Sequence, residues 1–247
     1  MRVSGGQAIY GATVGILMLD AQFPRIPGDM GNATTFPFPV QYRLVDGASP
    51  HKVVRDGAGG LLAPFIAAGR DLIRHGVDGI TTNCGFLSLF QAELAEALDV
   101  PVAASSLMQV GMVNSLLPPG KRAGILTISA STLTAQHLEA AHVPPDTPIA
   151  STEDGTEFTE AILGDAPTLD VAAAQADNIA AAQSLCASHP DVGAIVLECT
   201  NMTPYAAAIR VATGRPVFSM VTFVNWFQSG LAPRTYPQPG GPSFDLV

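Results

Sequence analysis

The chain has 247 residues, of which 47% are hydrophobic and only 13% are charged, and its formal net charge is −9. The length suits one large domain or two small ones, and the scarcity of charge indicates extensive burial, including a subunit interface. The acidic balance argues against binding to nucleic acid or an anionic membrane, and no stretch reaches the ~18–20 apolar residues of a membrane span. Three cysteines are too few for a disulfide framework, so a reducing cytoplasm is the expected location.

Short, mostly apolar runs rich in β-branched residues alternate with Ala- and Leu-rich stretches along the chain. The runs predict strands at residues 13–19, 40–45, 77–83, 101–106, 123–129, 192–198 and 216–221. The clearest helices are predicted at residues 86–98, 131–142, 170–188 and 203–213. Continuously apolar strands are typical of sheets covered on both faces, and their alternation with helices predicts a doubly wound parallel α/β architecture.

An internal repeat relates the two halves of the chain. Val77 lies seven residues before Cys84, and Val192 lies seven residues before Cys199. Each of these cysteines is followed 17 residues later by a Pro-Val pair that opens another predicted strand. The repeat predicts two related α/β lobes, with the end of the chain returning to the first one. The predicted lobes are residues 1–115 plus 216–247, and residues 116–215.

The two repeated cysteines are candidate catalytic residues. Cys84 and Cys199 end predicted parallel strands, which is where such sheets bind ligands. Two facing lobes would put one thiol on each wall of a cleft, so one thiolate could remove a proton from a carbon while the other thiol returns one to the opposite face. The helix N-terminus after each cysteine predicts a lowered thiol pKa and N–H donors for a substrate carboxylate. Neutral donors flank the pair at Thr82, Asn83, Thr200 and Asn201.

Other side chains give weaker signals. Cys186 lies inside the Ala-rich predicted helix and has no counterpart in the repeat, so we expect it to pack in the core. Residues 23–39 form a long Pro- and Gly-rich segment in which Arg25 could pair with a substrate carboxylate, although an ordinary structured loop or a dimer contact fits equally well. The five histidines show no metal-ligand spacing, so no metal site is expected.

The repeated strand-end cysteines, "GILMLD" near the N-terminus and the "LECTNM" block resemble the aspartate/glutamate/hydantoin racemase superfamily. The resemblance covers most of the chain and implies two pseudo-symmetric lobes with the active site between them. It also implies no pyridoxal phosphate, no metal, and a homodimer or higher homo-oligomer. Cys84 and Cys199 match the paired acid/base thiols, and Asp20 matches an aspartate that assists the first thiol. Positions that match substrate-contacting hydroxyls are Thr200, Ser129 and Thr132.

The chain departs from the superfamily beside both thiols. Asn83 precedes the first cysteine, and Gly85 and Phe86 follow it where amino-acid racemases usually carry Asn-Thr. Asn201 stands where the superfamily often has His or Glu, and an amide cannot relay a proton. We include these four residues in the predicted substrate-binding set. The departures preserve the paired thiols but argue against glutamate or aspartate as the substrate.

These patterns predict a cofactor-independent racemase or epimerase that inverts the α-carbon of a small carboxylate, an amino acid or a derivative. A maleate-type cis–trans isomerase would use the same two cysteines, and an arylmalonate-type decarboxylase would need only the second. A non-catalytic protein that binds a small acid is the alternative from a different class, and Asn201 is its best support.

Overall fold

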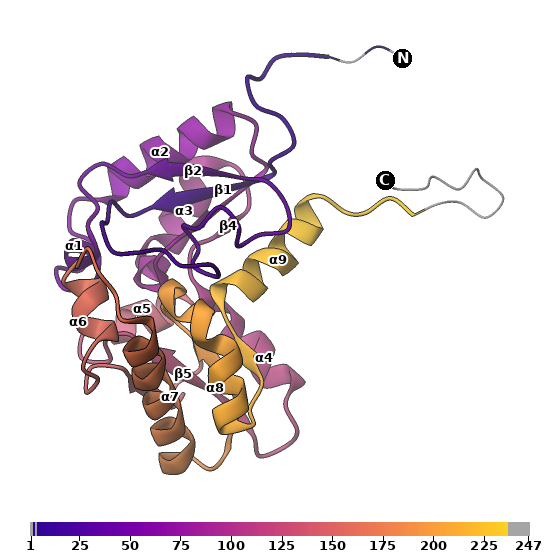
Figure 1. The fold of residues 1–247 in the computed structure, drawn as a ribbon. Coiled ribbons are helices and arrows are strands. Elements are labelled where there is room, and N and C mark those ends of the chain that lie inside the picture. Colours follow the sequence, from indigo (N-terminus) through magenta and orange to yellow (C-terminus); the bar gives the residue numbers. More distant parts are fainter. Residues whose placement is uncertain (1, 3, 237–247) are drawn as a thin grey trace.

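Two four-stranded parallel sheets, one in each lobe, form the framework of the computed structural model, which describes residues 2 and 4–236 (Figure 1). The first sheet has the order β2-β1-β3-β4 and the second has the order β6-β5-β7-β8, so the strands are arranged alike in both lobes. The predicted two-lobe α/β fold is therefore confirmed. The strands are β1 (Val14–Met18), β2 (Val40–Leu44), β3 (Gly79–Thr82), β4 (Val102–Ala103), β5 (Arg122–Thr127), β6 (Ile149–Ser151), β7 (Val192–Leu197) and β8 (Val217–Phe218).

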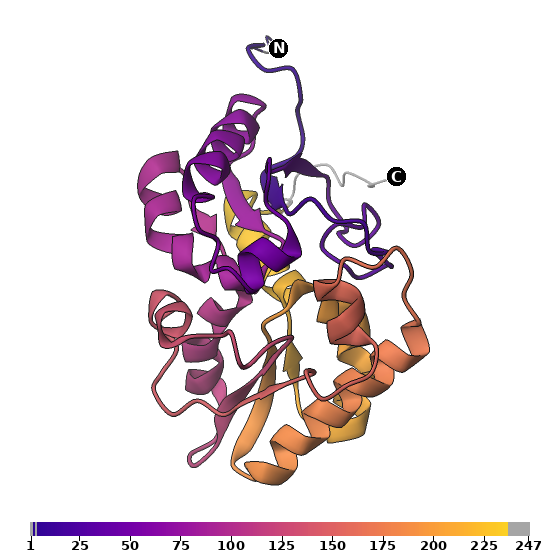
Figure 2. The same ribbon diagram turned by 90° about the vertical axis from the view of Figure 1, so that its left-hand side faces the viewer.

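Helices cover the faces of both sheets (Figures 1 and 2). Those before β5 are α1 (Pro50–Val54), α2 (Leu62–Arg74), α3 (Gln91–Leu98) and α4 (Val110–Leu116). Those after β5 are α5 (Ala135–Ala140), α6 (Phe158–Leu163), α7 (Val171–Ser188), α8 (Ala206–Thr213) and α9 (Met220–Leu231). Three 3-10 helices precede α3, α4 and α8 directly, and these are η1 (Gly85–Phe90), η2 (Ser106–Gln109) and η3 (Thr200–Tyr205).

A glycine in the central strand of each lobe lets the covering helix approach closely. A Cβ at Gly15 in β1 would come within 2.9 Å of Leu72 of α2. A Cβ at Gly124 in β5 would come within 2.9 Å of Leu185 of α7. The two "GIL" sequences therefore have the same packing role in the two lobes, because only glycine lets the leucine side chain rest directly on the sheet.

One helix next to each sheet packs against the sheet of the other lobe. Helix α4 leaves the first sheet and packs against β5, while α9 leaves the second sheet and packs against β3. Met220, Phe223 and Val224 of α9 form a buried cluster with Val14 and Ile16 of β1. In Figure 2 the yellow α9 accordingly lies within the upper lobe. The two lobes are therefore interlocked around a shared core.

The C-terminal part of the chain differs from the prediction in detail. The strand predicted at residues 216–221 ends at Phe218, because Ser219 caps α9 in a capping box with Thr222. Strand β8 pairs with β7 in the second sheet, so the return to the first lobe begins at α9. Residues 237–247 of the predicted first lobe lie outside the described residues.

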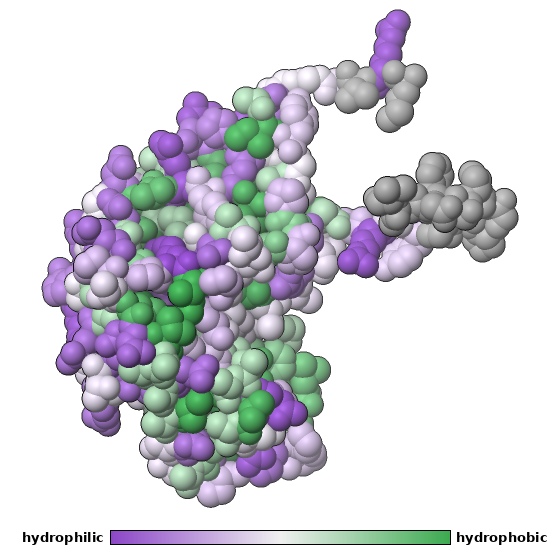
Figure 3. Space-filling model, viewed as in Figure 1, coloured by the Kyte–Doolittle hydropathy of each residue, from purple (hydrophilic) through white to green (hydrophobic). Residues whose placement is uncertain are grey.

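Hydrophobic side chains gather near the junction of the lobes, while hydrophilic ones cover much of the outer rim of the upper lobe (Figure 3). Within residues 2 and 4–236, no helix has the length and apolar character needed to cross a membrane.

Candidate active site

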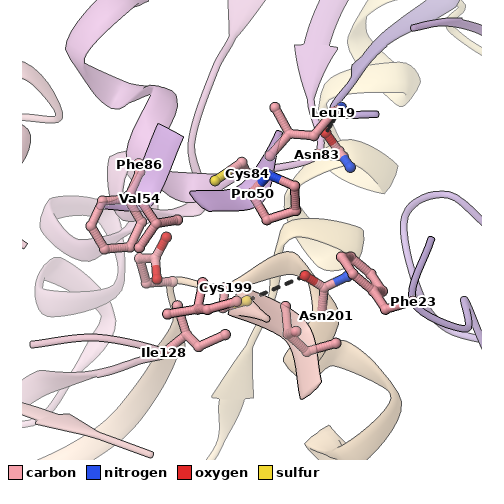
Figure 4. Close-up of a pocket in the computed structure, with 13 residues that line it drawn as sticks. Leu19, Phe23, Pro50, Val54, Asn83, Cys84, Phe86, Ile128, Cys199 and Asn201 are labelled. Carbon is pink, nitrogen blue, oxygen red and sulfur yellow. Dashed lines mark hydrogen bonds between the residues drawn. The ribbon is translucent and has the colours of Figure 1, made fainter. Parts of the chain in front are cut away.

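A small cavity of about 20 Å³ lies between the lobes at the carboxyl ends of the central strands. Cys84 lines one wall and Cys199 lines the opposite wall, so the two thiols face each other across the cavity (Figure 4). Most of the remaining lining is apolar. These apolar side chains are Leu19, Phe23, Pro50, Val54, Phe86, Ile128, Ile162 and Leu163.

Hydrogen bonds at the strand ends hold the two walls together. Asn83 follows β3, and its side-chain Oδ1 accepts a hydrogen bond from the Leu19 N–H at 2.8 Å. The Thr200 hydroxyl, from the other lobe, donates to the backbone oxygen of Asn83 at 2.6 Å. Ser106 in turn donates to the backbone oxygen of Leu197 at 2.6 Å. The bonds of Thr200 and Ser106 cross between the lobes and fix the separation of the two cysteines, while the Asn83–Leu19 bond lies within the first lobe.

Both thiols are poor acids in this environment, and the prediction of lowered pKa values is wrong. Burial raises the pKa of Cys84 above the ordinary value, and the charge of Glu198 raises it further, while the N–H groups of Phe86 and Leu87 act in the opposite direction. Burial and the charge of Glu198 also raise the pKa of Cys199. Loss of hydration raises the thiol pKa values by more than the N–H groups at the helix N-termini lower them, so both cysteines are neutral thiols near pH 7.

Glu198 is the residue of this cavity whose role the sequence did not reveal. Its side chain is fully buried, and Oε2 accepts a hydrogen bond from the Thr127 hydroxyl at 2.7 Å. The other oxygen, Oε1, has no hydrogen-bond partner. Burial raises the pKa of Glu198 to about 7, although hydrogen bonds from Thr127 and Ile128 lower it. The available signal was its position directly before Cys199 in "LECTNM", since a carboxylate next to a candidate catalytic thiol is unusual core material.

The unusual Gly85 is explained by Glu198. A Cβ at position 85 would collide with Oε1 and with the backbone oxygen of Glu198. The neighbouring Phe86 is buried and packs edge-on against His137, with ring centroids 5.0 Å apart. Glycine therefore leaves room for a carboxylate from the other lobe, and Phe86 supplies an apolar wall beside the first thiol.

A polar chain leads from Cys199 to the loop after β1. The Cys199 thiol donates to Asn201 Oδ1 at 3.5 Å, and Asn201 Nδ2 donates to the Asp29 carboxylate. Asp29 is buried and accepts a hydrogen bond from Arg25 Nη1 at 3.0 Å. Asn201 therefore holds the second thiol in place, and the buried Asp29 is a second residue near the site that the sequence did not reveal.

Comparisons by sequence find dimethylsulfoniopropionate lyases, while no protein-family model matches the chain. The chain is 28% identical over 236 residues to the lyase of Durusdinium sp. clade D, covering 89% of this chain and 75% of that protein. It is 30% identical over 233 residues to lyase 5 of Emiliania huxleyi, covering 87% of this chain and 45% of that protein. The chain thus spans only part of the length of the curated relatives that it matches.

Comparisons by structure find arylmalonate decarboxylase, with a TM-score of 0.60, 15% identity and coverage of 92% of this chain and 96% of that one. A glutamate racemase of Bacillus anthracis matches with a TM-score of 0.54, 14% identity and coverage of 90% and 84%. An allantoin racemase of Pseudomonas fluorescens matches with a TM-score of 0.54, 15% identity and coverage of 88% and 90%. The chain has the same fold as these decarboxylase and racemase structures.

Not every predicted site residue lies at the cavity. Asn83, Phe86 and Asn201 line it together with the two cysteines. Gly85 and Thr200 are buried directly beside them. The structure therefore brings most of the predicted set together around the two thiols.

Asp20 is exposed and does not line the cavity, whereas its neighbour Leu19 does. Ser129 and Thr132 also lie off the cavity: Thr132 donates to Ser129 at 2.8 Å, and Ser129 donates to Glu153 at 2.8 Å. In both lobes the residue directly after the central strand lines the cavity, and these residues are Leu19 and Ile128. The next residue, Asp20 or Ser129, does not line it, because successive side chains of an extended segment point to opposite sides.

Arg25 lies in the loop above the site and is engaged with Asp29, while its guanidinium carbon lies 4.6 Å from the centre of the Phe23 ring. Its Nη2 is buried without a hydrogen-bond partner, so a contact with a substrate stays a prediction. Cys186 is half-buried in α7 and packs against the core away from the cavity. Among the residues that the structure describes, no group of three His, Cys, Asp or Glu side chains could hold a metal ion.

Proposed function

We propose that the chain is a lyase that removes the proton α to a carboxylate and expels a leaving group from the β-carbon, with dimethylsulfoniopropionate as the substrate. The observation that carries the proposal is the pair of thiols facing each other across one apolar cavity beside a buried carboxylate. The similarity to dimethylsulfoniopropionate lyases over 89% of the chain supports the choice of substrate.

The proposed reaction needs one base and no added reagent. The reacting cysteine is a neutral thiol in the ligand-free protein, so it first releases its proton to solvent. The resulting thiolate takes the α-hydrogen as a proton, and the electron pair of that C–H bond becomes the second bond between the α- and β-carbons. The bond from the β-carbon to the sulfonium sulfur breaks, and its electron pair leaves with dimethyl sulfide. The products are acrylate and dimethyl sulfide, and the proton remains on the cysteine. Cys84 and Cys199 are the two candidates for this base, because both line the cavity.

Racemisation or epimerisation of a small carboxylate is the second candidate, and the thiols on opposite walls favour it. It begins with the same α-proton transfer, but the second thiol then returns a proton to the opposite face. The two reactions differ only in whether the intermediate carries a good leaving group on the β-carbon. A substrate with a sulfonium at that position directs the same site towards elimination.

Proton NMR in deuterated water tests the proposal and separates the candidates. We expect purified protein to convert dimethylsulfoniopropionate to acrylate and dimethyl sulfide. Deuterium entering the α-position of single-enantiomer amino acids or hydantoins, without loss of a group, would instead support a racemase. Isomerisation of maleate would support the cis–trans isomerase. Binding of these acids without any reaction would support a binding protein and overturn the proposed lyase.

A further inference from the structure

We propose that Glu198 is the counter-ion for a positively charged group of the substrate, so that the cavity selects onium acids, which are small carboxylates bearing a sulfonium or quaternary ammonium group. This inference deepens the proposed function and rests on it for the presence of such a substrate in this cavity. It assigns a specificity role to a residue that lines the cavity together with both thiols.

The first support is that Glu198 lacks a counter-charge of its own. Its side chain is 0% exposed, and Oε1 has no hydrogen-bond partner. Within the described part of the chain, no Lys, Arg or His forms an ion pair with it. An unpaired buried carboxylate is costly, because water no longer solvates the charge. A cation bound in the cavity would supply the missing positive charge.

The second support is the kind of cation that the cavity can accept. A primary ammonium brings three N–H donors that all need acceptors. The other side-chain oxygens at the cavity are engaged, since Asn83 Oδ1 accepts from Leu19 and Asn201 Oδ1 accepts from the Cys199 thiol. A sulfonium or quaternary ammonium has no N–H donor and carries methyl groups. Such a group suits apolar and aromatic walls such as Val54, Phe86 and Ile128.

The third support is that the sequence preserves space for this carboxylate. Glycine at position 85 is required beside Glu198, because any side chain there would occupy the place of Oε1. The free oxygen therefore has a defined position in contact with the wall that bears Cys84. A residue that only filled the core would need neither the charge nor this gap.

Binding of an onium group would also activate the thiols. The charge of Glu198 raises the pKa of both Cys84 and Cys199. A cation placed against Glu198 offsets that charge, so a thiol loses its proton more readily when the onium substrate is bound. Because the positive charge disappears as the leaving group departs, Glu198 stabilises the bound substrate more than the transition state. Its removal should therefore raise KM without lowering kcat.

Calorimetry with two unreactive acids of the same shape tests the inference. The cationic ligand is 3-(trimethylammonio)propanoate, and the neutral one is 4,4-dimethylpentanoate, in which carbon replaces nitrogen. We expect the wild-type protein to bind the cationic acid at least roughly tenfold more tightly than the neutral one. In Glu198→Gln the two affinities should become equal within about threefold. Glu139→Gln, which removes a charge from the exposed side of α5, should keep the wild-type preference.

Equal binding of both acids by the wild-type protein would overturn the inference, and this comparison needs no variant to fold. An unchanged preference in Glu198→Gln would overturn it as well. Since neither ligand reacts, the result is independent of turnover. Cleavage of dimethylsulfoniopropionate without a charge preference would refute the role of Glu198 alone. A charge preference without cleavage would refute the lyase alone.

Discussion

Replacing Glu198 with glutamine should change how the stability of the protein depends on pH. The side chain is fully buried, and its pKa is raised from 4.5 to about 7 because burial disfavours the charged form. In the unfolded chain the same carboxyl group ionises near its ordinary value. Ionisation therefore favours unfolding wherever the pH lies above that ordinary value.

The magnitude follows from the difference between the two pKa values. A pKa difference of about 2.5, at about 1.4 kcal/mol for each pKa unit, corresponds to about 3–4 kcal/mol. Because the pKa is higher in the folded state, this stability is fully present below pH ~4.5 and is lost as the pH rises through about 7. For a chain of this size, about 3–4 kcal/mol shifts Tm by roughly 6–16 °C.

Thermal unfolding of the ligand-free wild type and Glu198→Gln from pH 4.5 to 8, under reducing conditions, measures this effect. The Tm of the wild type should fall relative to that of the variant as the pH rises. Any fixed offset from the altered hydrogen bonding of the amide is independent of pH, so only the slope matters. Glu139→Gln on the surface should follow the wild type. A Tm difference that stays constant between pH 4.5 and 8 would refute the assignment of a buried, titrating Glu198.

Three further predictions concern the site and its loop. Gly85→Ala should destabilise the protein by about 1–3 kcal/mol in urea unfolding and abolish activity, whereas Gly111→Ala, which meets no neighbour within 4 Å, should do neither. In the ligand-free protein, iodoacetamide at pH 7.5 should alkylate Cys84 and Cys199 more slowly than the unfolded chain, and rapid labelling would contradict their raised pKa values. Asp165→Ala should accelerate hydrogen exchange at residues 22–23, because the Asp165 carboxylate accepts hydrogen bonds from their N–H groups. Unchanged exchange would show that these two hydrogen bonds do not hold the start of the loop in place.

The sequence predicted the architecture well because the repeat consists of spacings between residues that are close together in the chain. The matched spacing from each cysteine to the Pro-Val pair reflects equal lengths of the 3-10 helix (η1, η3) and of the helix that follows it (α3, α8). Helix α7 begins where Asp170 caps it. Strand β6 was missed because it is a three-residue edge strand, too short to show a hydrophobic period. The predicted homodimer stays a prediction.

The chemistry of the site was less predictable, because it depends on long-range burial. A helix N-terminus next to a cysteine is visible in the sequence, but the loss of water around the thiols appears only when the two lobes close over them. The same closure brings Glu198 of one lobe against Gly85 of the other, more than 100 residues apart in the chain. No local pattern reports such a contact.

Release of dimethyl sulfide from dimethylsulfoniopropionate, measured by headspace gas chromatography, tests most directly whether the two facing thiols form one active site. The three cysteines provide their own control, since Cys186 packs away from the cavity. We expect Cys186→Ser to match the wild type, Cys84→Ser and Cys199→Ser both to be slower, and the variant lacking the base to lose at least roughly 100-fold in rate. Wild-type rates in both Cys84→Ser and Cys199→Ser would contradict a thiol-based site in this cavity.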